Sequence, residues 1–156
     1  MVQKIDPLKE SAPKRRGRPP AYDAEAALAK ALEAFWQAGF AATSLDDLAA
    51  ATGMNRPSLY GAFGDKRALY LKTLAHYRAG GKLRDALAYD CPLAESLRRV
   101  YAAALAIYYS GDAGPRGCYL IGTAATEAVH DAEVRRALAE GLREIDDAFA
   151  ARFRLA

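Results

Sequence analysis

Cysteine and histidine are scarce in this chain of 156 residues, and it contains no long apolar run. Its two cysteines, Cys91 and Cys118, can build neither a disulfide framework nor a four-ligand zinc site. The two histidines are isolated, so we expect no metal site and no cofactor. No segment reaches the roughly 18 uninterrupted apolar residues of a membrane span, and the charged N-terminus lacks a secretory apolar segment. These absences predict a protein of the reducing cytoplasm that makes no membrane contact.

Sequence motifs of catalysis are also missing. The chain has no glycine-rich phosphate loop, no Gly-x-Ser-x-Gly turn and no plausible catalytic triad. We therefore expect no enzymatic activity and look for the function in binding.

Alanine dominates the composition, and β-branched residues are few. Hydrophobic residues make up 52% of the chain, which is enough for a real core. The alanine bias favours long helices, and no segment has the pattern of a strand. The sequence therefore predicts an all-α fold, with a small N-terminal helical bundle joined to a partial C-terminal helical domain.

The basic charge is concentrated in one half of the chain. Residues 1–84 carry 14 Lys and Arg against 8 Asp and Glu, whereas residues 85–156 carry 8 against 11. The net charges are therefore +6 and −3. This asymmetry points to a polyanionic partner for the first half, and nucleic acid fits best.

Residues 1–22 have the composition of a flexible basic arm. They contain four prolines and the run Lys14-Arg15-Arg16-Gly17-Arg18, with almost no apolar periodicity. The run resembles an AT-hook, whose arginines enter the narrow minor groove of A·T-rich DNA. A generic basic tail that binds phosphates fits about equally well. Arg15, Arg16 and Arg18 are DNA-binding candidates in both interpretations.

Helix signals begin at Asp23, a candidate N-cap for a helix that Gly39 closes. Ser44 with Asp47 resembles a capping box for a second helix, and Gly53 ends that helix. Further helices are predicted from Asn55 to about residue 63, over 66–78, 92–109 and 118–129, and from Asp131 to about residue 153. The expected division is an arm (1–22), an N-terminal helical domain (23–80) and a C-terminal helical domain (81–156).

Residues 44–63 have the spacing of a helix-turn-helix. Two short helices are joined by Gly53-Met54-Asn55, a turn that forces them to cross steeply and that suits the left-handed backbone glycine allows. Leu48, Met54 and Leu59 are expected to fill the corner. The second of the two helices then presents short or hydrogen-bonding groups outward, as a helix that enters the major groove requires.

Three segments between about Ala24 and Tyr70 resemble the TetR family of bacterial transcriptional regulators. They are Thr43–Ala49, Gly53–Tyr60 and Phe63–Tyr70, in the family's order. The resemblance implies that Arg56, Pro57, Ser58 and Tyr60 contact bases and nearby phosphates. It implies that Thr43, Ser44 and Lys66 clamp the DNA backbone. The alternative is that Ser58 and Tyr60 are ordinary surface residues.

The same resemblance implies a C-terminal domain that binds a small-molecule effector and dimerises. The candidate pocket residues are Tyr101, Tyr108, Cys118, Thr123 and Glu127. For the two tyrosines, the alternative to a pocket role is simple packing. Cys118 could act as a redox sensor, and the alternative is that it is buried and inert.

The last predicted helix carries a sustained apolar stripe that needs a partner surface. The resemblance implies that this stripe and a following helix form a homodimer interface. The chain stops at Ala156, so we expect a truncated domain and a weakened dimer. The leading prediction is a repressor that leaves a palindromic operator in double-stranded DNA when an unknown small molecule binds. The alternative is a nucleoid-type protein that uses the basic arm with little sequence preference.

Overall fold

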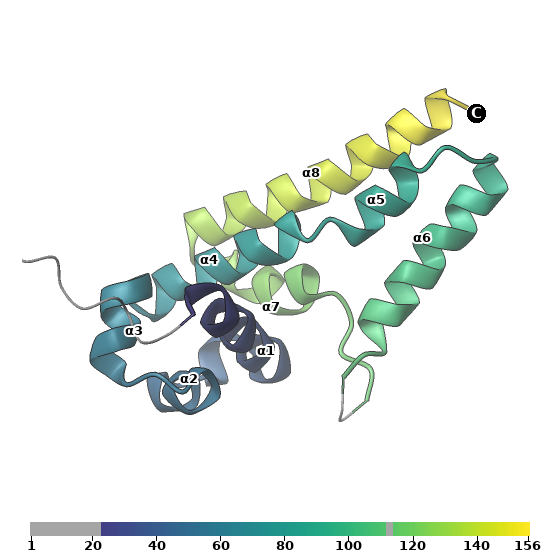
Figure 1. The fold of residues 1–156 in the computed structure, drawn as a ribbon. Coiled ribbons are helices and arrows are strands. Elements are labelled where there is room, and N and C mark those ends of the chain that lie inside the picture. The colour runs from purple at the N-terminus through teal and green to yellow at the C-terminus, as the bar shows by residue number, and fades with distance from the viewer. Residues whose placement is uncertain (1–22, 112–113) are drawn as a thin grey trace, which may run out of the picture.

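The computed structural model describes residues 23–111 and 114–156, and these residues form eight α-helices and no strand. The all-α prediction is confirmed. None of the helices within these ranges is long and apolar enough to cross a membrane. Figure 1 shows their arrangement, and their bounds are α1 Ala24–Ala42, α2 Leu45–Thr52, α3 Arg56–Phe63, α4 Lys66–Ala79, α5 Lys82–Ala88, α6 Leu93–Tyr108, α7 Tyr119–Glu127 and α8 Ala132–Arg154.

Polar caps define the starts of the first four helices. The side chain of Asp23 accepts hydrogen bonds from two backbone N–H groups of α1, and Asn55 and Asp65 cap α3 and α4 in the same way. Ser44 and Asp47 form the expected capping box at α2. Gly39 differs from its predicted role, because it kinks α1 at a positive φ of 77° and the helix continues to Ala42.

One hydrophobic core runs through the N-terminal and C-terminal helices. Phe35 of α1, Leu48 of α2 and Leu74 of α4 are fully buried in it together with Tyr119 of α7. Figure 1 shows α7 beneath α4 and beside α1, with the long helix α8 lying over α4. The helix-turn-helix is therefore built on the same core as α7 and the start of α8. The domain boundary at residue 80 stays a proposal.

Two tyrosines and two threonines join α4 to α7 in a reciprocal arrangement. The Tyr70 hydroxyl donates to Thr123 Oγ1 at 2.8 Å, and the Thr123 hydroxyl donates to the Tyr119 carbonyl at 2.8 Å. In the mirror-image pair, the Thr73 hydroxyl donates to the Tyr70 carbonyl at 2.7 Å and lies 2.7 Å from the Tyr119 hydroxyl. Because the Thr73 proton is already used, Tyr119 must be the donor to Thr73. All four buried hydroxyls are therefore satisfied.

This burial predicts alkaline destabilisation of the fold. Desolvation raises the pKa of Tyr70 from 10.0 to about 12, because the buried ring disfavours the phenolate. The unfolded chain then loses its tyrosine proton near pH 10, whereas the folded chain keeps it up to about pH 12. Stability is unaffected below pH 10 and falls between pH 10 and 12, by about 1.4 kcal/mol at pH 11 from this residue.

Urea unfolding of the wild type and of Tyr70→Phe at pH 8 and pH 11 measures this effect. The wild type should lose about 1.4 kcal/mol more than the variant between the two pH values. Equal losses in the two proteins would show that Tyr70 is not responsible.

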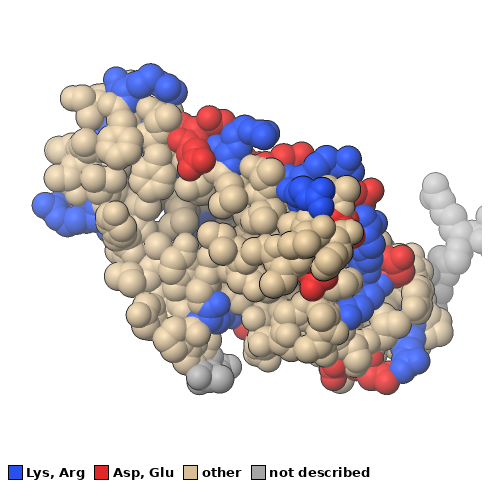
Figure 2. Space-filling view, turned by 180° about the vertical axis from the view of Figure 1, so that it is seen from behind, with Lys and Arg blue, Asp and Glu red and all other residues tan. Residues whose placement is uncertain are grey.

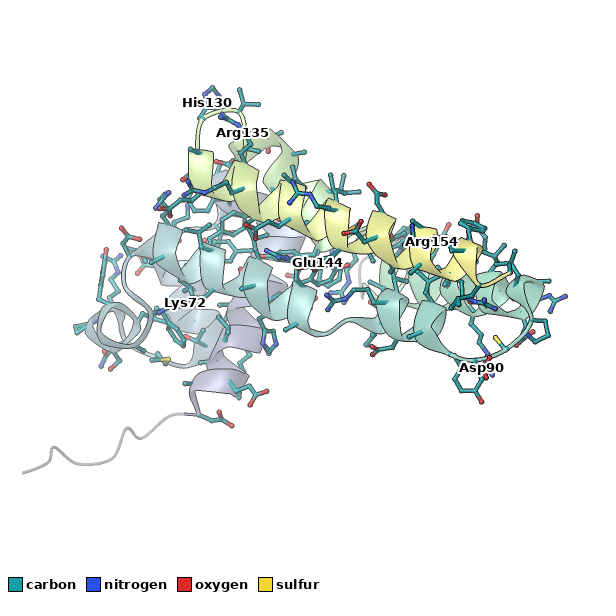
Figure 3. The ribbon with its side chains drawn as sticks, turned by 90° about the horizontal axis from the view of Figure 1, so that it is seen from above. Lys72, Asp90, His130, Arg135, Glu144 and Arg154 are labelled. Atoms are coloured by element: carbon teal, nitrogen blue, oxygen red, sulfur yellow. The ribbon has the colours of Figure 1, made fainter. Side chains whose placement is uncertain are left out.

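Arginines connect α4 and α5 to α8 at two points. Near the start of α4, Arg67 binds Asp131, the N-cap of α8, and Glu133 at 3.0 Å. Its hydrogen bonds hold the pKa of Asp131 well below the usual range. Near the end of α4, Glu144 of α8 forms ion pairs with Arg78 at 2.5 Å and with Arg84 of α5 at 3.0 Å. Figure 3 shows Glu144 between α8 and the junction of α4 and α5. These contacts tie the bundle that carries the helix-turn-helix to the longest helix.

Two features of the C-terminal half differ from the sequence prediction. Helix α5 was not predicted, because Gly81, the residue before its first turn, offers no side chain to cap it. Helix α6 buries Val100 but leaves Leu105 exposed, and Tyr101, a predicted pocket residue, is 68% exposed. On α8, Val134 is buried whereas Leu142 and Phe153 are exposed.

Candidate DNA-binding site

Helices α2 and α3 form the predicted helix-turn-helix. Gly53 ends α2 in the left-handed conformation with φ of 71°, and its N–H donates to the Ala49 carbonyl at 3.0 Å. Leu48, Met54 and Leu59 are buried in the corner between the helices, as expected. The turn is short because glycine accepts this backbone without strain. The angle between α2 and α3 is therefore set by residues inside the motif.

The outer face of α3 is polar and accessible. Arg56 and Pro57 occupy its first turn and are exposed, as is Gly61, and Ser58 is half-buried. Tyr60 is 48% exposed although it is a large aromatic residue. Asn55 accepts from the Ser58 N–H at 2.9 Å, so the first turn is firmly capped. The four residues predicted to read DNA thus lie together on one short helix that ends inside the core at Phe63.

Arg56 is held by a neighbouring carboxylate. Its Nε and Nη2 atoms donate to the two oxygens of Asp46 in α2, at 2.8 Å and 2.5 Å. The hydrogen bond and charge of Asp46 raise the pKa of Arg56, which stays cationic. Sequence analysis did not find this pair, since ten residues separate its members.

The three predicted backbone clamps differ in accessibility. Thr43 is only 1% exposed, and its hydroxyl donates to the Gly39 carbonyl at 2.6 Å. The kink at Gly39 places this carbonyl within reach of the hydroxyl. The Thr43 side chain is therefore packed in the core and does not lie on the surface as a backbone clamp would. Ser44 is exposed, and its hydroxyl donates to Asp47 at 2.7 Å. Lys66 lies 4.5 Å from the Phe40 ring centroid at the start of α4, where helix N–H groups also attract phosphate.

Lys72 of α4 is a further positively charged residue of this site. Its Nζ donates to the Phe63 carbonyl at 3.1 Å and to the Ala62 carbonyl at 3.4 Å. These carbonyls end α3, where a cation offsets the negative end of the helix dipole. Lys72 thereby attaches the end of α3 to α4. No local sequence signal indicates this contact, because it depends on how α4 crosses α3.

Charges of both signs are interspersed on the face shown in Figure 2. Uncharged residues predominate on the half of this face that lies away from α2 and α3, with charged side chains scattered among them. The arm residues Arg15, Arg16 and Arg18 lie outside the described residues.

A cavity of about 490 Å³ lies on the other side of the core, among α1, the α4–α5 junction, α6, α7 and α8. Trp36, Tyr77 and Tyr108 contribute aromatic walls, and Arg116 contributes a cation. The Arg116 guanidinium lies 3.8 Å from the Trp36 ring centroid, and it pairs with Glu33. The volume is typical of sites for small organic molecules.

The cavity includes two of the five predicted effector residues. Tyr108 and Cys118 line it, and the Cys118 sulfur lies 3.7 Å from the Tyr77 hydroxyl. Tyr101 faces solvent. Thr123 is buried in the core, where its hydroxyl is hydrogen-bonded to Tyr70 of α4 and to the Tyr119 carbonyl of α7. Glu127 is half-buried and is not part of the cavity wall. Trp36 and Arg116 were not predicted, because segments distant in the sequence bring them there.

Similarity to known proteins agrees with this geometry. The family model for bacterial regulatory proteins of the tetR family matches residues 27–73. The chain is 37% identical to the HTH-type transcriptional repressor ComR of Escherichia coli over 127 residues, 80% of this chain and 60% of ComR. The chain is 29% identical to the regulator YezE of Bacillus subtilis over 135 residues, 85% of this chain and 69% of YezE. The chain thus spans about three fifths of the length of ComR.

Two solved structures share the fold. One is a cysteine variant of the TetR family transcriptional regulator CifR bound to 26-base-pair operator DNA, with 33% identity and a TM-score of 0.61. It matches over 85% of this chain and 76% of its own. Reduced Escherichia coli NemR superposes with a TM-score of 0.72 at 22% identity, over 84% of this chain and 69% of NemR, and supports the fold alone. The helix-turn-helix geometry, the family model and the CifR similarity lead to one conclusion: this chain belongs to the TetR family of bacterial transcriptional regulators.

Proposed function

We propose that this protein is a cytoplasmic transcriptional repressor that binds a palindromic operator in double-stranded DNA as a homodimer. The observation that carries the proposal is the outer face of α3, where Arg56, Ser58 and Tyr60 are accessible at the start of a capped helix. Such a helix can place its N-terminal residues against base edges in the major groove. Ser44 and Lys66 are the proposed phosphate contacts.

A small-molecule effector is the proposed signal. Support comes from the cavity beside Tyr108 and Cys118, whose aromatic walls suit a mainly apolar molecule with a polar group. Because α4 forms part of the cavity wall and also holds α3 through Lys72, occupancy of the cavity can favour one arrangement of the two DNA-reading helices of the dimer. The proposed ligand contacts are limited to residues that line the cavity.

Selection from a library of duplexes with a random central segment tests the DNA-binding proposal. The expected result is a palindromic consensus whose half-sites lie about one helical turn apart. Enrichment of A·T-rich duplexes without a consensus would favour the alternative, a nucleoid-type protein that binds through its basic arm. Deletion of residues 1–19 separates the two further. The proposal expects weaker binding with a flatter salt dependence but the same consensus, whereas the alternative expects binding to be lost.

Thermal shift with a library of small organic molecules tests the effector proposal. Leu142 lines the cavity, and its side chain is exposed, so Leu142→Trp should fill the cavity without disturbing the core. A true effector should raise the Tm of the wild type, leave that of Leu142→Trp unchanged, and release the wild type from the selected duplex. A molecule that stabilises both proteins equally does not bind in this cavity.

A further inference from the structure

Asp46 has no role in the proposed function described so far, although its side chain is 72% exposed beside the DNA-reading helix. It is the second residue of α2, and Arg56 is the first residue of α3. We propose that Asp46 positions the Arg56 guanidinium for base contact and thereby sets the sequence specificity of the DNA site. This inference rests on the proposed function, in which Arg56 reads a base.

The pair is too exposed to serve mainly in folding. Arg56 is 56% exposed and Asp46 is 72% exposed, and ion pairs of this kind contribute little to stability because water screens them. The neighbouring carboxylate acts within its own helix, since Asp47 accepts from the N–H and the hydroxyl of Ser44 and so caps α2. Asp46 therefore contacts the DNA-reading residue, whereas Asp47 maintains the helix.

The geometry leaves one edge of the guanidinium open. Arginine has five N–H donors, and Asp46 occupies the side edge made by Nε and one N–H of Nη2. The end edge, made by Nη1 and the second N–H of Nη2, is not engaged by Asp46. That edge carries the parallel pair of donors that matches O6 and N7 of guanine. One side chain can thus bind the carboxylate and a base together.

The position of the pair is fixed from both helices. The capping box at Ser44 sets the first turn of α2, and the Asn55 cap with Pro57 sets the first turn of α3. Arg56 consequently gives up rotamer freedom before DNA binds, which lowers the entropy lost at the base contact. The carboxylate also repels phosphate, so a register that places the backbone beside Arg56 is penalised. Both effects increase the difference in binding affinity between operator DNA and unrelated DNA.

A double-mutant cycle tests this role. The variants are Asp46→Asn, Arg56→Ala and the double variant, with Glu25→Gln as a control that removes one exposed carboxylate in the first turn of α1. Affinities are measured for the duplex that the wild type selects, for duplexes with one changed base pair per half-site, and for an unrelated duplex. Circular dichroism melting confirms that each variant is folded.

At one base-pair position of the half-site, Asp46→Asn should reduce the affinity ratio between the selected and the changed duplex about tenfold. It should also tighten binding to the unrelated duplex. It should change nothing at that position when Arg56 is already alanine. Glu25→Gln should affect all duplexes alike. Unchanged discrimination in Asp46→Asn, or an equal loss in the Arg56→Ala background, overturns the proposal. Failure of the proposed function is seen separately, because the wild type itself then selects no sequence.

Discussion

Truncation of Tyr119 to alanine should lower the free energy of unfolding by about 3–5 kcal/mol and the Tm by about 6–20 °C. The ring is fully buried between α1, α4 and α7, with the centroids of Trp36 and Tyr77 each 5.4 Å away. Alanine removes these contacts and leaves a cavity that the rigid surroundings fill only in part. The expected loss is a large share of the roughly 5–15 kcal/mol that keeps a typical domain folded.

Two matched variants separate this effect from other causes. Tyr119→Phe keeps the ring and removes one hydrogen bond, and Thr73 still donates to the Tyr70 carbonyl, so the loss should be only about 1 kcal/mol. Tyr109→Ala removes an exposed tyrosine and should change stability by less than about 0.5 kcal/mol. Urea unfolding at pH 7 measures all three. A Tyr119→Ala protein as stable as Tyr109→Ala would show that α7 is not part of the core that supports the helix-turn-helix.

Arg56→Ala should weaken binding to the selected duplex by about 10–100-fold in each half-site while leaving the fold intact. Arg56 is exposed and its ion pair is with Asp46, which is more exposed still, so the Tm should move by no more than about 1 °C. The loss arises because the partner base keeps unpaired acceptors in a desolvated interface. Binding to unrelated DNA should fall much less, since the phosphate contacts are retained.

The control for this variant is Arg143→Ala, which removes one exposed arginine from α8. Both proteins lose the same charge, so a general electrostatic effect would weaken their DNA binding equally. Fluorescence anisotropy with the selected duplex at two salt concentrations compares them. Equal losses for Arg56→Ala and Arg143→Ala would exclude base reading by Arg56.

The features that depend on neighbouring residues could be predicted from the sequence. The caps at Asp23 and Ser44 and the turn at Gly53 follow from hydrogen bonds and backbone preferences within a few positions. These local signals located the whole helix-turn-helix. The family resemblance then singled out Arg56 and Tyr60, which the structure leaves exposed on α3.

Contacts between distant segments were not visible in the sequence. The burial of Thr43 depends on the kink at Gly39, and the pairing of Arg56 with Asp46 depends on the angle between α2 and α3. The reciprocal bonds of Tyr70 and Tyr119 require α7 to pack across α4. Hydrophobic periodicity indicates that a face is apolar, but the fold determines what covers it. Tyr101 is an example, because it lies among apolar residues of α6 and yet is exposed.

Base reading by Arg56 of α3 is tested most directly by removing single acceptor atoms from the DNA. Each guanine of the selected half-site is replaced in turn by its N7-deaza analogue, and affinity is measured for the wild type and for Arg56→Ala. We expect one position where the analogue weakens binding of the wild type about tenfold but has no further effect on the variant. If every position affects the two proteins equally, Arg56 does not contact a guanine and base reading by this residue is contradicted.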